Sequence, residues 1–425
     1  MKTIALPYGK SSLTLNVPED HLAGILTPHL HEYVPESGGA ELVYHALTHP
    51  IGTGRLCDLA AGKKRIVVIS SDHTRPVPSR IIMPQILSEI RLKNPDADIT
   101  ILIATGLHRA TTREELEEKF GSDIVKNERI VVHDCDDEAN LVYLGQLPSG
   151  GRLVLNRLAV EADLLVAEGF IEPHFFAGFS GGRKSVLPGV ASRESVSYNH
   201  NYRFIASDRA RTGLLLDNPI HRDMLYAAEK ARLAFIVNVI IDAAHQPVYA
   251  VAGDSAQAHK AGTDFLIKEC QVEAIPADIV VTTNGGYPMD RNIYQAVKGM
   301  TAAEASVKKG GVIIMCAQAV DGHGAPAFYQ TFRDEPSLEN MMETFSRRRP
   351  EETEPDQWQS QILARVLLKA KVIFVSACPD QMVRDMHMTP AHSLEEAFAL
   401  AKSLIKRDNY SVTVIPDGVA VMVKE

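Results

Sequence analysis

The sequence predicts an α/β protein with two lobes, each built on a mainly parallel, Rossmann-like sheet. Two observations support this prediction. Short aliphatic runs without polar alternation recur along the chain, which is typical of strands buried on both faces. Segments with helical periodicity separate these runs, as in successive βαβ units. Because open sheets of this kind bind ligands beyond the carboxyl ends of their strands, we expect the active site in the cleft between the lobes.

The first lobe contains four such aliphatic runs. They are RIVVIS (65–70), ITILIA (99–104), RIVVH (129–133) and ADLLVAEG (162–169). The intervening segment 79–93 has helical periodicity. A second helix is expected after Thr112, since Thr112 and Glu115 have the spacing of a capping box and Gly121 provides a stop signal.

The second lobe is expected from ADIVVTTNGG (277–286), GGVIIMCAQ (310–318) and AKVIFVSACP (370–379). The segment 272–276 is a plausible link to this lobe, and the charged segment 346–357 reads as a surface loop. The last apolar stretch, YSVTVIPDGVAVMV (410–423), predicts a hairpin that turns at Pro416-Asp417-Gly418.

The length of 425 residues favours two domains. We expect an N-terminal domain over residues 1–271 and a C-terminal domain over residues 272–387. Because the apolar strands of the expected C-terminal hairpin need a sheet to join, we expect residues 388–425 to complete the N-terminal domain.

The composition indicates a globular protein whose partner is a small molecule. It has 44 basic and 53 acidic residues, and the net charge of -9 argues against nucleic acid or an anionic membrane as the main partner. No apolar run approaches the length of a membrane span, and no leader is evident, so a cytoplasmic location is expected.

The five cysteines are scattered without a C-x-x-C pair, which indicates reduced core residues rather than disulfides or a zinc site. The acidic segment DCDDE (134–138) lacks the ligand spacing of a calcium loop, and we interpret it as a solvated turn.

The stretch GFSGGRKSVLPG (178–189) resembles a phosphate-binding loop but departs from it at one position. Gly178 and the Lys184-Ser185 pair have the required spacing, whereas Arg183 stands where the second glycine of that loop belongs. This substitution argues against a P-loop nucleotide hydrolase.

Polar residues gather directly after several predicted strands, where an open α/β sheet binds its ligand. The loops that follow the strands carry Asp72, His73, Thr74 and Arg75; His108; Glu172, His174, Arg183 and Lys184; and, in the second lobe, Asp290, Tyr294, Gln295 and Lys298. No serine or cysteine has an evident catalytic partner. Two histidines and several cations are therefore expected to share one cleft.

These motifs together resemble those of the nickel-pincer-dependent lactate racemases and their relatives. The resemblance covers nearly the whole chain and rests on DHTRPVP, TGLHR, EPHFFAGFSGGRKSVLPGVASRESV with the later NHN, and YQAVKGM. It implies a 2-hydroxy acid racemase or epimerase that carries a pyridinium-3,5-bisthiocarboxylic acid mononucleotide with nickel. It also implies that other proteins make this cofactor and insert its nickel.

The resemblance assigns the cofactor to the first lobe. Lys184 is expected to bond covalently to it, and His200 is expected to be the protein ligand of nickel, which imidazole suits. Residues expected around the nucleotide and its phosphate are Asp72, Thr74, Ser180, Gly181, Gly182 and Arg183.

The expected reaction removes the α-hydrogen of a 2-hydroxy acid as hydride, because abstracting it as a proton beside a carboxylate would give a very unstable dianion. The flat 2-keto acid can then take hydride back on either face. His108 and His174 fit the two alternating bases for the hydroxyl proton. Arg75 and Lys298 are expected on the substrate carboxylate, and Tyr294, Gln295 and Trp358 resemble residues that close over the substrate.

Lactate is the favoured substrate, and the alternative is another 2-hydroxy acid such as malate, an aryl lactate or a sugar acid. A different class would be a P-loop-like hydrolase or a two-lobed ligand-binding protein. Paired histidines and a lysine able to form a covalent bond argue against binding alone.

Overall fold

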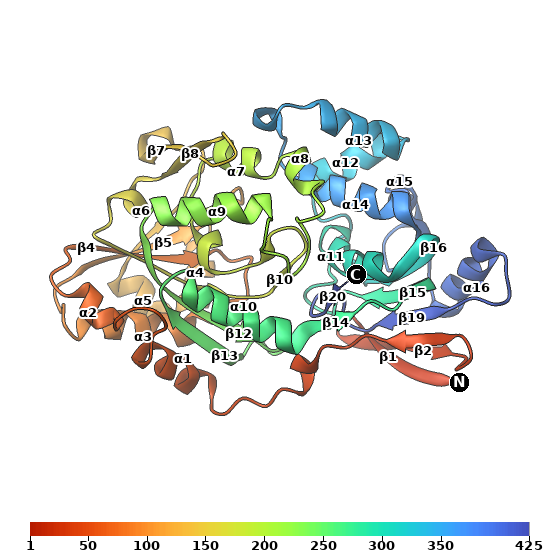
Figure 1. Ribbon diagram of the computed structural model, residues 1–425, viewed down its shortest axis with the longest axis horizontal. Helices are drawn as coiled ribbons and strands as arrows, with labels where there is room; N and C mark the ends of the chain where they lie inside the picture. Colours follow the sequence, from red (N-terminus) through yellow and green to blue (C-terminus); the bar gives the residue numbers. More distant parts are fainter. Residues whose placement is uncertain (425) are drawn as a thin grey trace. The chain divides into compact units, whose positions relative to one another are not determined.

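The chain, in a computed structural model that describes residues 1–424, folds into two compact units (Figure 1). The large unit contains residues 30–268 and 350–352. The small unit contains residues 1–29, 269–349 and the segment from 353 onward. Each unit is an α/β structure, so the predicted fold class is confirmed.

The large unit is built on a six-stranded sheet in the order β13-β12-β9-β4-β5-β6. All pairs are parallel except β12–β13. The strands are β4 Arg65–Ser71, β5 Asp98–Ala104, β6 Arg129–Val132, β9 Leu164–Phe170, β12 Leu233–Ile241 and β13 Pro247–Gly253. The four strands predicted for this lobe are therefore confirmed, while β12 and β13 were not predicted.

Helices cover both faces of this sheet. One face packs an aliphatic core against α1 Gly39–Thr48, α2 Leu56–Ala60, α3 Ser79–Arg91 and α4 Arg113–Phe120. The opposite face carries α9 Pro219–Lys230 (Figure 1). The short 3-10 turn η3 Gly182–Ser185 packs against α9 and against β9 and β12. The other elements of this unit are η1 His29–Glu32, α5 Ser122–Asn127, η2 Glu138–Asn140, β7 Leu141–Gln146, β8 Arg152–Asn156, α6 Arg157–Glu161, β10 Pro173–His174, β11 Gly178–Phe179, α7 Arg193–Asn199 and α8 Tyr202–Ile205.

The predicted capping box at the start of α4 is confirmed. The Glu115 backbone N–H donates to Thr112 Oγ1 at 3.3 Å, and the Thr112 N–H donates to a Glu115 carboxylate oxygen at 2.8 Å. These two reciprocal bonds satisfy donors that the first turn of a helix otherwise leaves unpaired. Gly121 follows as the C-cap, as its sequence position predicted.

The small unit has a second six-stranded sheet, ordered β18-β17-β16-β15-β19-β3, in which every pair is parallel. The hairpin β1–β2 and helix α16 cover one face, and α11 and α14 pack against strands of the same sheet. The strands are β1 Lys2–Tyr8, β2 Ser11–Val17, β3 Leu22–Ile25, β14 Gln271–Glu273, β15 Ala277–Thr283, β16 Val307–Cys316, β17 Lys371–Val375, β18 Thr389–Ala391, β19 Val412–Ile415 and β20 Met422–Lys424. The helices are α11 Ile293–Ser306, α12 Pro326–Asp334, α13 Leu338–Arg347, α14 Gln357–Lys369, α15 Asp380–Asp385 and α16 Leu394–Ile405. The 3-10 turn η4 Pro350–Glu352 belongs to the large unit. Helix α10 Gln257–Cys270 leads from the large unit into the small one.

The C-terminal segment corrects two predictions. β19 lies between β15 and β3, and β20 pairs with β14, all in parallel, so residues 410–423 do not form a hairpin. All three partner strands, β3, β14 and β15, belong to the small unit, as does the N-terminal hairpin. The expectation that residues 388–425 complete the N-terminal domain is therefore wrong, and so is the start of that domain at residue 1. The physical reason is that β19 is buried along its whole length and needs a neighbour on each side, which β15 and β3 provide.

Each sheet changes the direction of its strand order at one point. In the large unit this point lies between β4 and β9, and in the small unit it lies between β15 and β19. Loops that leave the carboxyl ends of strands diverge there and open a crevice that can accept a ligand. The predicted site residues follow β4, β5, β9 and β15.

Candidate active site

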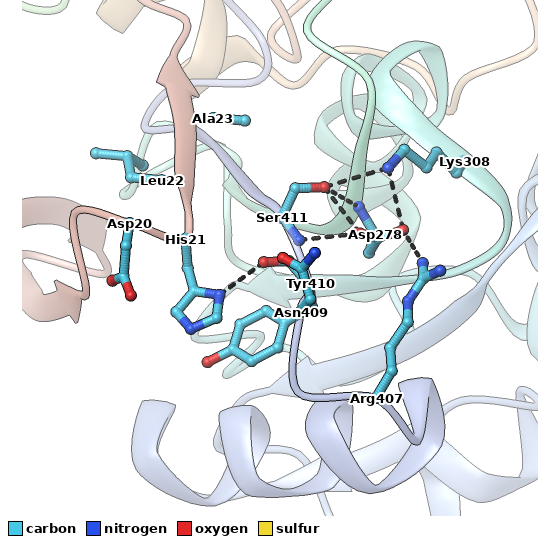
Figure 2. Close-up of a pocket in the computed structure, with 10 residues that line it drawn as sticks. All are labelled: Asp20, His21, Leu22, Ala23, Asp278, Lys308, Arg407, Asn409, Tyr410 and Ser411. Atoms are coloured by element: carbon cyan, nitrogen blue, oxygen red, sulfur yellow. Dashed lines mark hydrogen bonds and ion pairs between the residues drawn. The ribbon is translucent and has the colours of Figure 1, made fainter.

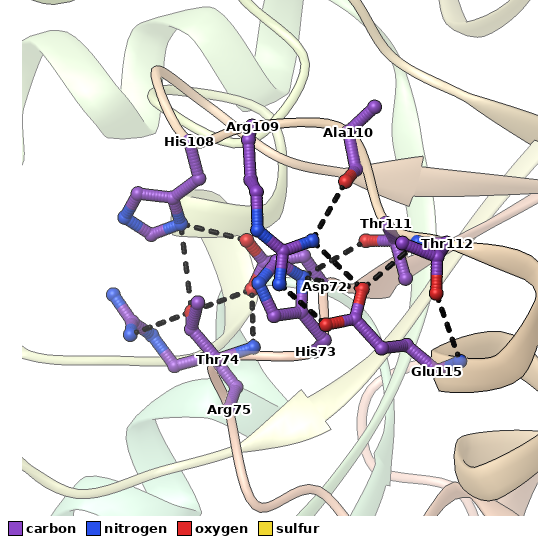
Figure 3. Close-up of polar contacts among 10 residues, drawn as sticks. All are labelled: Asp72, His73, Thr74, Arg75, His108, Arg109, Ala110, Thr111, Thr112 and Glu115. Atoms are coloured by element: carbon purple, nitrogen blue, oxygen red, sulfur yellow. Dashed lines mark hydrogen bonds and ion pairs between the residues drawn. The ribbon is translucent and has the colours of Figure 1, made fainter.

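A carboxylate–imidazole pair lies at the carboxyl ends of β4 and β5 (Figure 3). Asp72 follows β4, and its Oδ2 atom is 2.7 Å from Nδ1 of His108, which follows β5. The other carboxylate oxygen accepts from the Thr74 backbone N–H at 3.1 Å and from the Thr74 hydroxyl at 2.6 Å. Arg75 Nη1 donates to that hydroxyl oxygen at 3.0 Å. The structure thus brings together four of the predicted site residues.

These contacts determine the charge of Asp72. Burial by itself would raise the pKa of this carboxyl, but the hydrogen bonds from His108 and Thr74 and the nearby positive charge of Arg75 outweigh that effect and lower its pKa to about 2. Asp72 is therefore ionised at neutral pH and acts as an acceptor. His108 must donate from Nδ1, which leaves Nε2 as the atom that can exchange a proton with a ligand.

His73, next to Asp72 in the sequence, is not part of this pair. Its Nδ1 atom lies 3.2 Å from the hydroxyl of Thr111 and 3.7 Å from the Glu115 carboxylate. Glu115 also pairs with Arg109. His73 therefore ties the loop after β4 to the start of α4.

A second cluster surrounds the ring of Phe176, in the loop after β9. His174 and His200 both contact this ring edge to face, with centroid distances of 4.4 and 5.1 Å. The Lys184 ammonium lies 5.6 Å from the ring centroid, as in a cation–π contact. Phe176 was not predicted as a site residue, although the sequence PHFF signalled an aromatic surface beside His174.

His174 has a defined orientation. Its Nδ1 atom accepts the backbone N–H groups of Phe176 and Ala177 at 3.5 and 3.3 Å. In the neutral imidazole the proton is then on Nε2. His108 and His174 are thus both held through Nδ1, the first by a carboxylate and the second by backbone amides.

His200 has the features of a metal ligand. It caps the C-terminus of α7, it is 4% exposed, and its Nδ1 atom lies 3.0 Å from the Val196 carbonyl oxygen. Burial and the nearby positive charge of Lys184 lower its pKa to about 3, so the imidazole is neutral. With Nδ1–H donating to a backbone carbonyl, Nε2 holds the lone pair that a metal ion needs. A buried neutral imidazole of this kind fits nickel.

Backbone hydrogen bonds link the two clusters. The Gly106 N–H donates to the Gly189 carbonyl at 3.0 Å, and the Gly189 N–H donates to the Lys184 carbonyl at 3.1 Å. A side chain at residue 189 would collide with the Ser185 carbonyl, 2.2 Å from the position of a Cβ atom. Glycine is therefore required where the loop that bears His108 meets the turn that bears Lys184.

The glycine-rich loop uses most of its polar groups within the protein. Ser180 Oγ accepts from the Glu172 N–H and donates to the Phe170 carbonyl, and the Gly182 N–H donates to Asn238 Oδ1. Gly181 and Gly182 lie against neighbouring elements of the large unit. Cβ atoms there would meet Asn238 and His259, so these glycines allow the loop to pack against β12 and α10.

Arg183 also departs from its expected place. It is 2% exposed, and its guanidinium donates to protein carbonyls and to His221 rather than extending outward. The sequence shows a cation beside Lys184 but does not show in which direction it points. We therefore assign Arg183 to the support of the loop.

The predicted site residues of the small unit lie on two helices. Tyr294, Gln295 and Lys298 are on α11, which follows β15, and Trp358 is in the first turn of α14. The Tyr294 hydroxyl donates to Asp356 at 2.9 Å, and Gln359 Nε2 donates to the Tyr294 carbonyl at 2.6 Å. These contacts hold Tyr294 against the start of α14.

Asp290, also singled out in the sequence, supports this edge of the small unit. It is 1% exposed and accepts from the Gly9 and Gln318 backbone N–H groups at 2.6 and 3.1 Å. It therefore ties the β1–β2 turn to the loop after β16 and has no free face for a ligand.

A separate polar hollow of about 370 Å³ lies in the small unit (Figure 2). Asp278 within it accepts from Ser411 and pairs with Lys308 and Arg407. Asp278 is the second residue of β15 and Ser411 precedes β19, so the hollow lies at the amino ends of these strands. The hollow is therefore at the opposite edge of the sheet from the carboxyl ends of the strands, where an open α/β sheet binds its ligand.

The structure also describes the cysteines, the acidic segment and the helices. All five cysteines are free and buried. Asp136 of the acidic segment pairs with Arg193 at 2.7 Å. None of the helices described in residues 1–424 combines the length and the apolar character that crossing a membrane requires.

Comparison with known families gives two matches that together span most of the chain. The lactate racemase N-terminal domain matches residues 8–213, and the lactate racemase C-terminal domain matches residues 272–423. The chain is also similar to the lactate racemases of Thermoanaerobacterium thermosaccharolyticum and Lactiplantibacillus plantarum. The identities are 55% and 50%, with 100% of both chains covered in each case.

Solved structures agree with these matches. The lactate racemase apoprotein from Thermoanaerobacterium thermosaccharolyticum has a TM-score of 0.96 at 54% identity, with 100% of both chains covered. A crystal structure of a Thermotoga maritima protein has a TM-score of 0.64 at 20% identity, covering 92% of this chain and 100% of that one, and this likeness concerns the fold alone.

The buried imidazoles predict how stability changes with pH. Burial first, and then the charge of Arg183, lower the pKa of His221 to about 3, below the value of about 6.5 in an unfolded chain. Between about pH 3 and about pH 6.5 the His221 imidazole is protonated more in the unfolded chain than in the folded one. The free energy of unfolding therefore decreases progressively as the pH falls from about 6.5 towards 3, and His221 has no such effect above about pH 6.5. His221→Gln should weaken the loss of stability on acidification by up to ~1.4 kcal/mol per pH unit. Calorimetric Tm values between pH 7 and 4 would test this, and parallel curves for the two proteins would contradict it.

Proposed function

The chain belongs to the lactate racemase family and is an isomerase, and from this premise we propose that it interconverts D- and L-lactate by hydride transfer through a 2-keto acid. The observation that carries the proposal is the pair of oriented histidines, His108 and His174, in loops beyond the carboxyl ends of β5 and β9. Lys184 and the buried His200 lie beside the second of them, around the same aromatic ring.

We propose that the large unit carries the nickel-pincer nucleotide, bound covalently through Lys184 and with His200 as the nickel ligand. The neutral, buried imidazole of His200, fixed through Nδ1, supports this assignment because its donor atom suits nickel. When bound, this group supplies the acceptor and donor of the hydride. We propose that the nucleotide is surrounded by Thr74, Ser180, Gly181 and Gly182. Asp72 is proposed to orient this pocket.

The two histidines then transfer the proton of the substrate hydroxyl. His108 takes the proton from the substrate hydroxyl at Nε2, where its lone pair lies, as the α-hydrogen leaves as hydride. In the opposite direction His174 is the base, once its own proton has moved from Nε2 to Nδ1 and the contacts of Nδ1 with the two backbone N–H groups have opened. The product is a planar 2-keto acid, and the other imidazole returns a proton to its oxygen when hydride is delivered to the opposite face. Asp72 keeps His108 in the tautomer that this step requires, since its carboxylate accepts the Nδ1 proton.

The substrate carboxylate is assigned to Arg75 and Lys298. Arg75 uses one nitrogen to hold Thr74, and its planar guanidinium offers further N–H donors suited to a carboxylate. Tyr294, Gln295 and Trp358 are proposed to close over the substrate. The proteins that make the cofactor and insert nickel, and a cytoplasmic location, belong to the same proposal.

The second candidate is racemisation or epimerisation of another 2-hydroxy acid, with the same proton-transfer residues. Malate, an aryl lactate and a sugar acid are the cases to test. Family membership leaves no support for a nucleotide hydrolase or a protein that only binds its ligand.

Replacing Lys184 tests the covalent attachment. Lys184→Ala should abolish the mass increase of the cofactor-loaded protein, because no amine is left at that position. Lys230→Ala, at the exposed last residue of helix α9, is the matched control and should keep the full adduct. Intact-protein mass spectrometry reads both variants, and an adduct that persists without Lys184 would refute the assignment.

Replacing either base tests proton transfer. His108→Gln and His174→Gln should each lower kcat in both directions by roughly 100-fold or more, because every turnover uses one imidazole as base and the other as acid. His73→Gln, whose ring faces Thr111, is the control and should stay near the unaltered rate. Equal rates for all three variants would contradict the assignment.

Substrate size follows from the available charges. Arg75 and Lys298 account for one carboxylate, and a second carboxylate buried without a partner would cost several kcal/mol. We therefore expect kcat/KM for lactate to exceed that for malate by at least ~100-fold. A direct comparison of lactate, malate, phenyllactate and a sugar acid at equal cofactor loading measures this. A preference for any of the other three would select the second candidate function.

A further inference from the structure

Arg183 occupies a buried cage of hydrogen-bond acceptors inside the large unit. Its Nη2 atom donates to the Ala177 carbonyl at 2.8 Å. Its Nη1 atom donates to the carbonyls of Ser180 and Gly181 at 3.2 and 3.3 Å. One guanidinium therefore binds three carbonyls of the loop that leads into Lys184, here called the Lys184 loop (residues 177–184).

Two imidazoles complete the cage from neighbouring helices. Arg183 Nε donates to Nδ1 of His221 on α9 at 3.0 Å. Nη1 lies 3.0 Å from Nε2 of His259 on α10, and the same Nε2 atom lies 2.9 Å from the Ser180 carbonyl oxygen, to which it can donate. A guanidinium can only donate, so His221 must accept and must be neutral. Burial and the charge of Arg183 lower the pKa of both imidazoles, which keeps them neutral at physiological pH.

The surroundings of this cation do not include a carboxylate. Burial lowers the pKa of the Arg183 guanidinium to about 9, and no carboxylate among the described residues counteracts that shift. Hydrogen bonds to three carbonyls and to His221 offset the cost of burying the charge. A phosphate ligand would need donors that already point into the protein, so Arg183 is poorly placed to bind one.

The backbone of the same loop is fixed from the other side by Asn238 on β12. Asn238 Oδ1 accepts the Gly182 N–H at 2.8 Å. Gly181 and Gly182 have φ angles of 73° and 50°, in the left-handed region that glycine tolerates. The loop is thus held in an unusual backbone conformation by side chains from β12, α9 and α10.

We propose that Arg183 is a positioning residue that, together with His221 and His259, holds the Lys184 loop in the shape that presents Lys184 for covalent attachment. This inference rests on the proposed function of Lys184. It gives Arg183 a role through the protein interior rather than through contact with the nucleotide.

The test compares three variants of Arg183 with a matched arginine elsewhere in the large unit. Arg183→Met removes the charge, Arg183→Lys keeps it without the planar fork, and Arg183→Ala leaves space for added guanidinium ion. Arg55→Met is the control, because Arg55 makes a two-pronged pair with Glu89 at 2.9 Å, between the start of α2 and α3. Backbone hydrogen exchange across the Lys184 loop and the rate of adduct formation at Lys184 are measured for each protein.

Arg183→Met and Arg183→Lys should speed exchange of the Lys184 loop and slow adduct formation, each by at least ~10-fold, as expected for the loss of hydrogen bonds made by a charged group. Guanidinium chloride at a non-denaturing concentration should restore part of the adduct rate to Arg183→Ala. Arg55→Met should change neither quantity by more than ~2-fold.

Unchanged exchange in the Arg183 variants, equal effects in Arg55→Met, or the absence of guanidinium rescue would each overturn the proposal. If the unaltered protein forms no adduct at Lys184, the proposed cofactor attachment fails. The exchange measurement, which needs no cofactor, then still decides whether Arg183 holds the loop.

Discussion

The carboxylate of Asp72 is the group on which the geometry of the candidate site depends most. It is buried at the end of β4, and a buried carboxylate stays ionised only if hydrogen bonds replace its water. Thr74 and His108 provide those bonds, and in doing so they acquire fixed orientations. The parallel arrangement of β4 and β5 makes the contact possible, because both strands end at the same edge of the sheet. One electrostatic requirement thus links the fold to the tautomer of a proposed catalytic base.

In the second cluster, around Phe176, the side chains are oriented by other groups. His174 is oriented by backbone amides, His200 by a backbone carbonyl, and the Lys184 loop by a buried guanidinium. Charges and dipoles of the chain itself, rather than ion pairs, shape this part of the site. Such an arrangement leaves the reactive atoms of His174 and His200 defined before any ligand binds, which lowers the cost of ordering them during reaction.

The sequence predicted the parts of the fold that depend on local patterns. Continuous aliphatic runs located β4, β5, β6, β9, β15, β16 and β17, and the Thr112–Glu115 spacing located the start of α4. Residues 410–423 were misread because an apolar strand, a proline–glycine turn and another apolar strand look the same whether the strands pair with each other or with distant partners. Arg183 was misread for a similar reason, since its type and position indicate a cation near Lys184 but not its direction. Asn238 and His259 act through contacts with residues far along the chain, and a single sequence does not reveal such contacts.

The central claim is that Asp72 holds His108 with its proton on Nδ1, so that Nε2 serves the substrate. Nitrogen-15 NMR of the histidine side chains in the cofactor-free protein tests it most directly, at a pH where the His108 ring is neutral. The account predicts that His108 is predominantly the Nδ1–H tautomer in the unaltered protein and that Asp72→Asn shifts it towards a mixture with the Nε2–H form. The same tautomer mixture in both proteins would contradict the account.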